Sequence, residues 1–271
     1  MELAQLYPES NIFLLDANDG ARKIVDSKEL GFGGFEALPN LVYYPCDKWD
    51  RSVATETHVG VLQAYEDIKK LHRPGDFVCM DTAGDLRDLA RDFYCETMYK
   101  MSYDKYTFTE KMKKGTSTSL SFGGLDSDEW GIIGGIHDGV VWHAFHRLDC
   151  NVILTTQVRQ IVMKNVKNVQ TGQNEQMPLE KGLDEAWVKL GVYPESDKKV
   201  PTDVDTVLYL DVKEKPKAGK METVWTARYV AKDRGQKVSE VRQFDFDTNT
   251  PFWVAYCESK GLDVGKAPGS T

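Results

Sequence analysis

The chain has 271 residues, of which 41% are hydrophobic and 28% charged, and its formal net charge is −8 at pH 7. This is the composition of a globular protein, and it excludes a disordered, collagen-like or coiled-coil chain. No run approaches the roughly 18–20 apolar residues of a membrane helix, and the first ten residues lack the basic and apolar segments of a signal peptide, so we expect no membrane association.

The first half of the chain alternates short apolar runs with helical patterns. Residues 11–16 and 76–81 are predicted as buried strands that each end on an aspartate. A helix is predicted over residues 52–71, and residues 86–93 show the i, i+3, i+4, i+7 spacing of an amphipathic helix.

The middle of the chain is predicted to contain two long loops. Residues 111–139 combine lysines with several glycine pairs, and residues 159–181 are polar and rich in Asn and Gln. Long loops in compact domains are commonly functional or disordered. Between them, a helix is predicted over residues 141–148 and a third buried strand over residues 151–157.

The last third of the chain is predicted to be rich in strands. A short helix over residues 183–190 is followed by three strands, at residues 205–212, 223–231 and 241–246. With no internal repeat and no clear linker, we expect one core over residues 1–260 and a flexible tail over residues 261–271.

Strands separated by helices predict an α/β fold with a mostly parallel sheet and helices on both faces. In such sheets, ligands bind beyond the carboxyl ends of the strands. Three polar residues, Asp16, Asp81 and Gln157, end the three predicted strands of the first part of the chain. The sequence therefore predicts a binding site at this edge of the sheet.

Taken together and in order, these segments resemble the RecA-like P-loop ATPases, in particular the phage-encoded AAA group associated with recombination and single-strand annealing. The strand before Thr82 resembles a Walker B strand, and the strand before Gln157 resembles the one that ends in a phosphate-sensing glutamine. The remaining segments that carry the resemblance are residues 12–20, 201–210 and 230–235.

The resemblance implies a RecA-like three-layer sandwich that binds ATP and Mg²⁺. Asp81 would hold the Mg²⁺ through water, and Asp16 and Thr82 would complete the nucleotide site. It also implies catalytic roles for Asp19 and Gln157. The alternatives that the residues leave open are helix caps for Asp81 and Asp19, and a polar strand end for Gln157.

Two basic residues near the end of the chain would act on the nucleotide of a neighbouring subunit. By resemblance, Lys232 and Arg234 would stabilise phosphate charge in trans, as arginine fingers do. This role requires a homo-oligomeric ring or filament. The alternative is an exposed basic turn.

The two predicted loops fall where RecA-like proteins contact single-stranded DNA. The candidate contacts are cationic side chains of both loops: Lys113, Lys114, Arg159, Lys164 and Lys167. Because the chain is acidic overall, binding would depend on these local groups. The alternative is a pair of solvated loops.

One element of the resembled family is missing from the sequence. No G-x-x-x-x-G-K-[ST] motif is present, and this motif supplies the amides, the lysine and the hydroxyl that bind phosphates and Mg²⁺. Residues 2–8 resemble the end of the helix that follows the P-loop. We therefore expect the first, P-loop strand to be absent and its place beside residues 151–157 to be vacant or filled by another strand.

Other site chemistry is weakly indicated. His143 and His146 lie three residues apart, but they lack the closed Cys/His set of a structural zinc site. The five cysteines are odd in number and widely spaced, which is typical of reduced thiols in a cytoplasm, the host cytoplasm if the protein is phage-encoded.

The leading hypothesis is a phage-type RecA-like domain that couples ATP binding or hydrolysis to single-stranded DNA handling in recombination or replication. Without a P-loop, ATPase activity of this chain remains open. The alternative is a non-catalytic DNA-binding, assembly or scaffold protein of the same ancestry.

Overall fold

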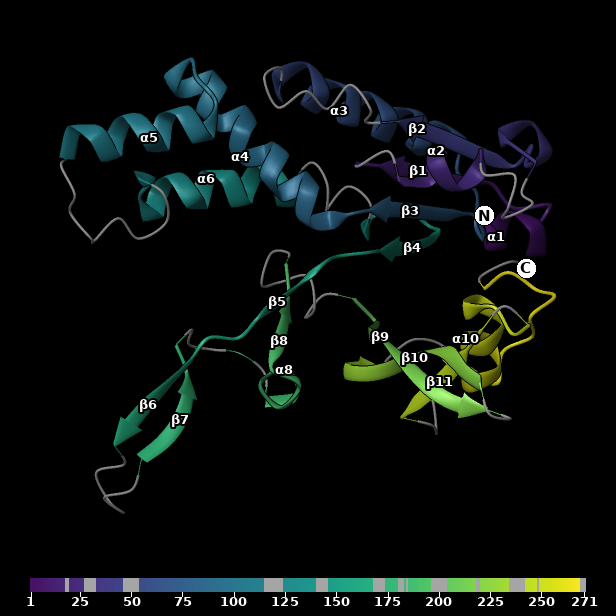
Figure 1. Cartoon of the computed structure of the whole chain (residues 1–271). Helices are drawn as coiled ribbons and strands as arrows, with labels where there is room; N and C mark the ends of the chain where they lie inside the picture. Colours follow the sequence, from purple (N-terminus) through teal and green to yellow (C-terminus); the bar gives the residue numbers. More distant parts are fainter. Residues whose placement is uncertain are drawn as a thin grey trace. The chain divides into compact units, whose positions relative to one another are not determined.

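The structure of the protein, a computed structural model (Figure 1), divides the chain into two compact units. Unit 1 contains Met1–Thr156 and Gly265–Thr271, and unit 2 contains Gln157–Val264. The sequence predicted one core over residues 1–260 and a tail over residues 261–271. The boundary at residue 260 does not coincide with the boundaries between the two units. The structure describes residues 1–17, 20–26, 33–45, 54–114, 124–139, 146–167, 174–179, 183, 185–195, 204–217, 220–233, 242–247 and 249–268.

Unit 1 is built on a four-stranded parallel sheet with the order β2-β1-β3-β4. Its strands are β1 (Ile12–Asp16), β2 (Leu41–Pro45), β3 (Phe77–Asp81) and β4 (Asn151–Leu154). The buried strands predicted at residues 11–16 and 76–81 are confirmed, and each begins one residue later than predicted. Within the described residues β4 pairs with β3 alone, so it forms an edge of the sheet.

Helices contact both faces of this sheet. On one face, Phe13 and Met80 pack with α3 (Ala54–Leu71) and α4 (Ala83–Tyr99) in a single apolar cluster. On the other face, Tyr7 follows α1 (Glu2–Leu6) and stacks on Phe77, with ring centroids 5.4 Å apart. An α2 helix (Gly20–Val25) and a short 3-10 turn (Phe35–Ala37) connect β1 to β2. The predicted α/β class is therefore confirmed.

Of two further helices, the second lies within the loop predicted over residues 111–139, and the first overlaps that loop at residues 111–114. They are α5 (Tyr103–Lys114) and α6 (Ser127–His137). A capping box between Asp126 and Glu129 begins α6. Its residues Trp130 and Ile133 pack against α4, and this burial outweighs the cost of its glycines. The loop prediction is wrong for these two segments, and residues 115–123 lie outside the described part of the chain.

Unit 2 begins with four short strands, of which the first three lie in or overlap the loop predicted over residues 159–181. They are β5 (Val158–Gln160), β6 (Met163–Lys167), β7 (Asn174–Pro178) and β8 (Val192–Pro194). Strands β5 and β8 pair with each other, and β6 and β7 form an antiparallel two-stranded ribbon. The loop prediction for residues 159–181 is therefore wrong. The predicted short helix is present as α8 (Glu185–Leu190).

The rest of unit 2 is an antiparallel three-stranded sheet with the order β11-β10-β9. Its strands are β9 (Thr206–Lys217), β10 (Lys220–Asp233) and β11 (Gln243–Phe246), which confirms the strand-rich C-terminal part. Helix α10 (Phe252–Lys260) packs its aromatic residues on one face. The ring of Phe252 lies 5.9 Å from that of Phe244 and 5.2 Å from that of Phe246.

A buried aspartate joins the amino ends of the strands in unit 1. Asp76 is 2% exposed and accepts hydrogen bonds from the backbone N–H and the side-chain amide of Asn11, at 2.8 and 3.1 Å. The backbone N–H of Arg73 donates to the same carboxylate at 2.8 Å. Asn151 at the start of β4 donates its side-chain amide to the carbonyls of Asp76 and Pro268. These bonds align the starts of β1, β3 and β4.

Replacing Asp76 by alanine should lower the free energy of unfolding by about 3 kcal/mol, because three partly buried hydrogen bonds to its buried carboxylate would be lost. Urea denaturation followed by circular dichroism measures this change. As a control, Glu9→Ala removes an exposed carboxylate and should change the free energy by less than about 0.5 kcal/mol. Equal stability of the two variants would contradict the role given to Asp76.

The stability of unit 1 should fall on mild acidification. His58 is 5% exposed and stacks on Phe93 with centroids 4.3 Å apart, and burial lowers its pKa from the ordinary value of 6.5. The unfolded chain therefore binds a proton more readily than the folded chain once the pH falls below 6.5. This contribution is fully present above pH 6.5 and is lost as the pH falls toward the lowered folded pKa.

In urea titrations at pH 7.5 and 5.5, the parent should lose more stability between the two conditions than His58→Phe, which keeps an aromatic ring beside Phe93. His72→Phe, which changes a partly exposed histidine, serves as the matched control and should retain the parental pH dependence. An identical fall in all three proteins would refute the assignment to His58.

Candidate functional site at the carboxyl edge of the parallel sheet

The register of the sheet brings three polar side chains together at its carboxyl edge. Asp16 on β1 is the register partner of Asp81 on β3. Met80 is the partner of Leu154, the last residue of β4, so Thr155, which follows the strand, lies beside Asp81. Register partners on neighbouring strands project to the same face, because side chains alternate along each strand.

Backbone hydrogen bonds continue past the ends of these strands. The N–H of Ala17 donates to the carbonyl of Asp81 at 2.6 Å, and the N–H of Thr155 donates to Met80 at 3.0 Å. The N–H of Ala83 then donates to the carbonyl of Thr155 at 2.8 Å. The segments that leave β1, β3 and β4 are therefore held in one arrangement.

Asp81 and Thr155 form the accessible part of the site. The hydroxyl of Thr155 donates a hydrogen bond to Oδ1 of Asp81. Asp81 is partly exposed and Thr155 is exposed. This hydroxyl fixes the rotamer of a carboxylate that solvent reaches.

Thr82 begins helix α4. Its side-chain oxygen accepts a hydrogen bond from the N–H of Asp85 at 3.2 Å, and its hydroxyl donates to Oδ2 of Asp85 at 2.7 Å. The peptide bond between Asp81 and Thr82 is cis. Because Thr82 rather than Asp81 is the N-cap, the helix-cap interpretation of Asp81 does not hold.

Asp16 has a different environment from Asp81. It is 0% exposed and accepts hydrogen bonds from the N–H groups of Gly20 and Ala21, at 3.2 and 2.9 Å. The hydroxyl of Tyr43 on β2 donates to the same carboxylate at 3.0 Å. Asp16 thus joins β1 and β2 to the first turn of α2, and this accounts for its burial without a ligand.

The structure adds two residues to the predicted site, Tyr43 and Thr155. Nothing in the sequence sets Tyr43 apart from the other tyrosines. In the structure it is the register partner of Leu14, two residues before Asp16, and its hydroxyl reaches the Asp16 carboxylate. Thr155 lay inside the predicted strand over residues 151–157, but β4 ends at Leu154. The earlier strand end puts Thr155, one residue on, beside Asp81.

The predicted catalytic residues fall elsewhere or outside the described residues. Gln157 is exposed and is the first residue of unit 2, and its carbonyl accepts from the N–H of Glu195 at 2.7 Å. Lys232 lies on β10, but its side chain is outside the described part, as are Asp19 and Arg234.

The predicted DNA contacts lie on regular elements. Lys113 and Lys114 are the last residues of α5, and their side chains are outside the described part, as is that of Lys167 on β6. Arg159 on β5 lies over the ring of Tyr193, 5.8 Å from its centroid.

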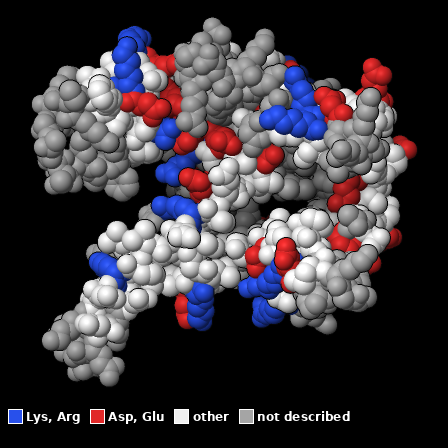
Figure 2. Space-filling model, in the orientation of Figure 1, with Lys and Arg blue, Asp and Glu red and all other residues white. Residues whose placement is uncertain are grey.

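The β6–β7 ribbon has two unlike faces. Its register pairs Asn165 with Gln176 on one face, which we call the amide face, and Lys164 with Met177 on the other. Asn165, Gln176 and Lys164 are all exposed. In Figure 1 the ribbon extends away from α8 and β8 of the same unit, and its described part carries few charged groups in Figure 2.

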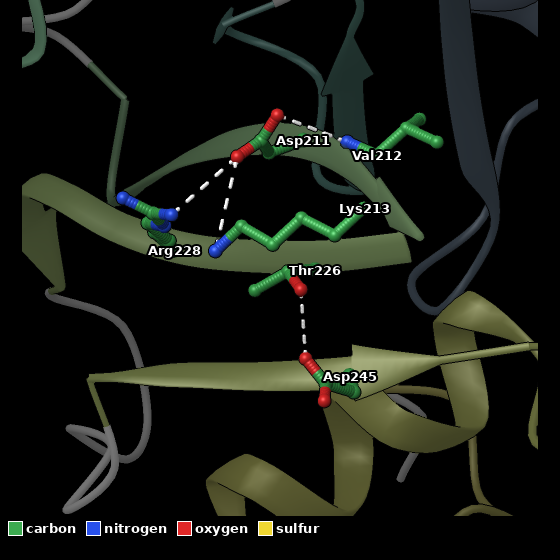
Figure 3. A network of polar contacts seen from close by, with 6 residues as sticks. All are labelled: Asp211, Val212, Lys213, Thr226, Arg228 and Asp245. Carbon is green, nitrogen blue, oxygen red and sulfur yellow. Dashed lines mark hydrogen bonds and ion pairs between the residues drawn. The ribbon is translucent and has the colours of Figure 1, made fainter. Parts of the chain in front are cut away.

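A second polar cluster lies on one face of the β9–β10–β11 sheet (Figure 3). Asp211 accepts from Nη2 of Arg228 at 3.4 Å and lies 4.0 Å from Nζ of Lys213. The buried hydroxyl of Thr226 donates to Asp245 at 2.7 Å. These carboxylates have partners on neighbouring strands, which fits a role in cross-strand pairing rather than in ligand binding.

Within the described residues, no group of three or more His, Cys, Asp or Glu side chains could hold a metal ion. His143 lies outside these residues, and His146 is exposed. Burial raises the pKa of the Cys95 and Cys150 thiols to about 12, so neither is a thiolate at neutral pH.

Comparison with protein-family models, with curated proteins and with solved structures finds no match for this chain. In the part of the chain that the structure describes, none of the helices has the length and apolar character needed to cross a bilayer. The chemistry of the site therefore rests on the residues themselves.

Proposed function

We propose that this chain is a RecA-like domain that links a Mg²⁺–nucleotide at the carboxyl edge of its parallel sheet to the handling of single-stranded DNA in recombination or replication. The observation that carries the proposal is the pairing of Asp81 with Thr155 at that edge. In open α/β sheets, this edge is where ligands bind.

The residues at the edge suit a hydrated Mg²⁺ ion. Mg²⁺ prefers oxygen ligands and keeps several waters, and it is commonly bound by one or two carboxylates together with the phosphates of a substrate. Asp81 would contact the waters of the ion, while Thr155 holds the carboxylate in place. When bound, Mg²⁺ neutralises negative charge on nucleotide phosphates.

The same residues do not suit ATP by themselves. A triphosphate needs a glycine-rich loop whose amides surround its oxygens, and the sequence contains no such loop. Among the described strands β4 has no partner on its second side, and an additional parallel strand with a phosphate-binding loop would join there, next to Thr155. We therefore expect ATP to bind this chain weakly unless such a strand is supplied.

The divalent-ion site can be tested with Mn²⁺, a paramagnetic substitute for Mg²⁺. In a two-dimensional NMR spectrum of the backbone amides, Mn²⁺ should broaden the signals of Thr82, Ala83 and Thr155 before those at the amino edge of the sheet. Excess Mg²⁺ should reverse the effect. Asp81→Asn should abolish it, because the amide keeps a hydrogen-bond acceptor but removes the charge.

The matched control is Asp88→Asn, which neutralises a partly exposed aspartate on the neighbouring helix α4. This variant should leave the broadening unchanged. If Mn²⁺ broadens the same signals in Asp81→Asn as in the parent, the ion is not held by Asp81. Calorimetry of the parent with ATP and Mg²⁺ should show no tight site, and a micromolar dissociation constant would contradict the need for an additional strand.

Single-stranded DNA is proposed to bind along β5 and the β6–β7 ribbon. Arg159, Lys164 and Lys167 supply cations, and the amide face of the ribbon supplies hydrogen-bond donors and acceptors. Tyr193 lies under Arg159 and is 6% exposed, so it supports the arginine and offers little surface to a base. Binding would be modest and sensitive to salt, because it rests on few phosphate contacts.

Replacing Arg159, Lys164 and Lys167 together by alanine should weaken binding of a labelled oligonucleotide in fluorescence anisotropy. The slope of log affinity against log salt should become shallower by about 2, since each phosphate contact on a single strand contributes about 0.7. Circular dichroism should be unchanged, because the two described side chains, Arg159 and Lys164, are exposed.

Lys23, Lys70 and Lys266, all exposed and all in unit 1, provide a control triple variant with the same change of net charge. It should bind DNA like the parent. Equal binding by both triple variants would exclude the ribbon as the DNA site. If the parent itself binds no DNA and no Mn²⁺, the chain is better described as a non-catalytic assembly protein, which the missing phosphate-binding loop favours.

A further inference from the structure

The second face of the β6–β7 ribbon is apolar and exposed. Val162, Met177 and Leu179 are between 48% and 64% exposed, and they lie on the same face as Lys164. The N–H of Leu179 donates to the carbonyl of Val162 at 2.8 Å, so these two residues continue the ladder. We call these four residues the ribbon patch.

Exposure of this face is costly. A two-stranded ribbon alone is marginally stable in water and gains stability when an apolar face is covered. Clustered exposed apolar residues mark interaction surfaces more often than isolated ones do. The ribbon therefore has the properties of an arm that packs on another surface.

A second apolar surface lies on the edge strand β9. Leu210 and Val212 are register partners of Ala227 and Trp225, which in turn pair with Phe244 and Phe246 of β11. All six residues therefore share the face on which α10 packs.

Helix α10 contacts β11 but leaves the β9 part of this face open, where Leu210 and Val212 are 55% and 57% exposed. Glu214, two residues after Val212, is also exposed and lies on the same face. Leu210, Val212 and Glu214 are called the β9 patch.

We propose that the ribbon patch of one copy of this chain packs on the β9 patch of a second copy. Both patches belong to unit 2 and both are exposed, so they do not cover each other within one chain. Each is a flat strand surface with apolar residues and one described charged residue. These charges have opposite sign, Lys164 on the ribbon and Glu214 on β9.

The contact joins two different surfaces, so it is head-to-tail. Such contacts propagate into rings or filaments, whereas a contact between identical surfaces stops at a dimer. The amide face of the ribbon stays free in this arrangement. The inference goes beyond the proposed function, because it concerns assembly and needs neither nucleotide nor DNA.

Sedimentation velocity without nucleotide or DNA tests the contact. The parent should form species larger than a monomer as its concentration rises. A ribbon variant, Met177→Gln with Leu179→Gln, should remain monomeric, and so should a β9 variant, Leu210→Gln with Val212→Gln. A mixture of the two variants should form dimers and nothing larger, since only one intact ribbon can meet one intact β9 patch.

A charge exchange tests the same pairing without altering the apolar residues. Lys164→Glu and Glu214→Lys should each weaken association, and the chain that carries both changes should regain it. Met163→Gln changes an exposed residue on the opposite face of the ribbon and should associate like the parent. Circular dichroism checks that each variant is folded.

Three results would overturn the inference. One is a parent chain that stays monomeric at all concentrations. Another is a β9 variant that associates as the parent does, because the ribbon would then pack elsewhere. The third is failure of the double charge exchange to restore association when both single exchanges weaken it. None of these results depends on the Mn²⁺ or DNA measurements, so the inference and the proposed function can be refuted separately.

Discussion

The candidate site depends on one constraint, the parallel register that aligns β1, β3 and β4. It makes Asp16 the partner of Asp81 and leaves Thr155 beside Asp81. A shift of one residue would turn each of these side chains to the opposite face, where Phe13 and Met80 pack with α3 and α4. The buried apolar face therefore also fixes where the polar groups emerge.

Burial separates the roles of the two aspartates at this edge. Asp16 is enclosed by donors from its own chain, so its carboxylate organises the start of α2. Asp81 is oriented by Thr155 and remains open to solvent. At the opposite edge, Asp76 aligns the strand starts in the same way as Asp16 organises α2. Of the three, only Asp81 combines a fixed orientation with access, which is what a ligand needs.

In unit 2, the residues proposed to contact DNA or a second copy lie on the exposed surfaces of strands. The β6–β7 ribbon presents amide groups on one face and apolar groups on the other, since residues alternate along a strand. The amide face stays available to nucleic acid when a second protein copy covers the apolar face, whereas Lys164 lies on the apolar face and would be shared by the two contacts. The exposed part of β9 supplies a surface of matching character, left open because α10 packs toward β11.

Local patterns in the sequence determined the apolar strands β1 and β3 and the helices α3 and α4, because each of these elements buries one periodic face. They also placed aspartates at the strand ends. Only the tertiary structure decided that Tyr43 holds Asp16 and that Thr155, rather than Gln157, lies beside Asp81. The segments predicted as loops became α6, which packs on α4, and the β6–β7 ribbon, whose two strands pair with each other. In each case the stabilising contact is made to a segment other than the one that carries the local pattern.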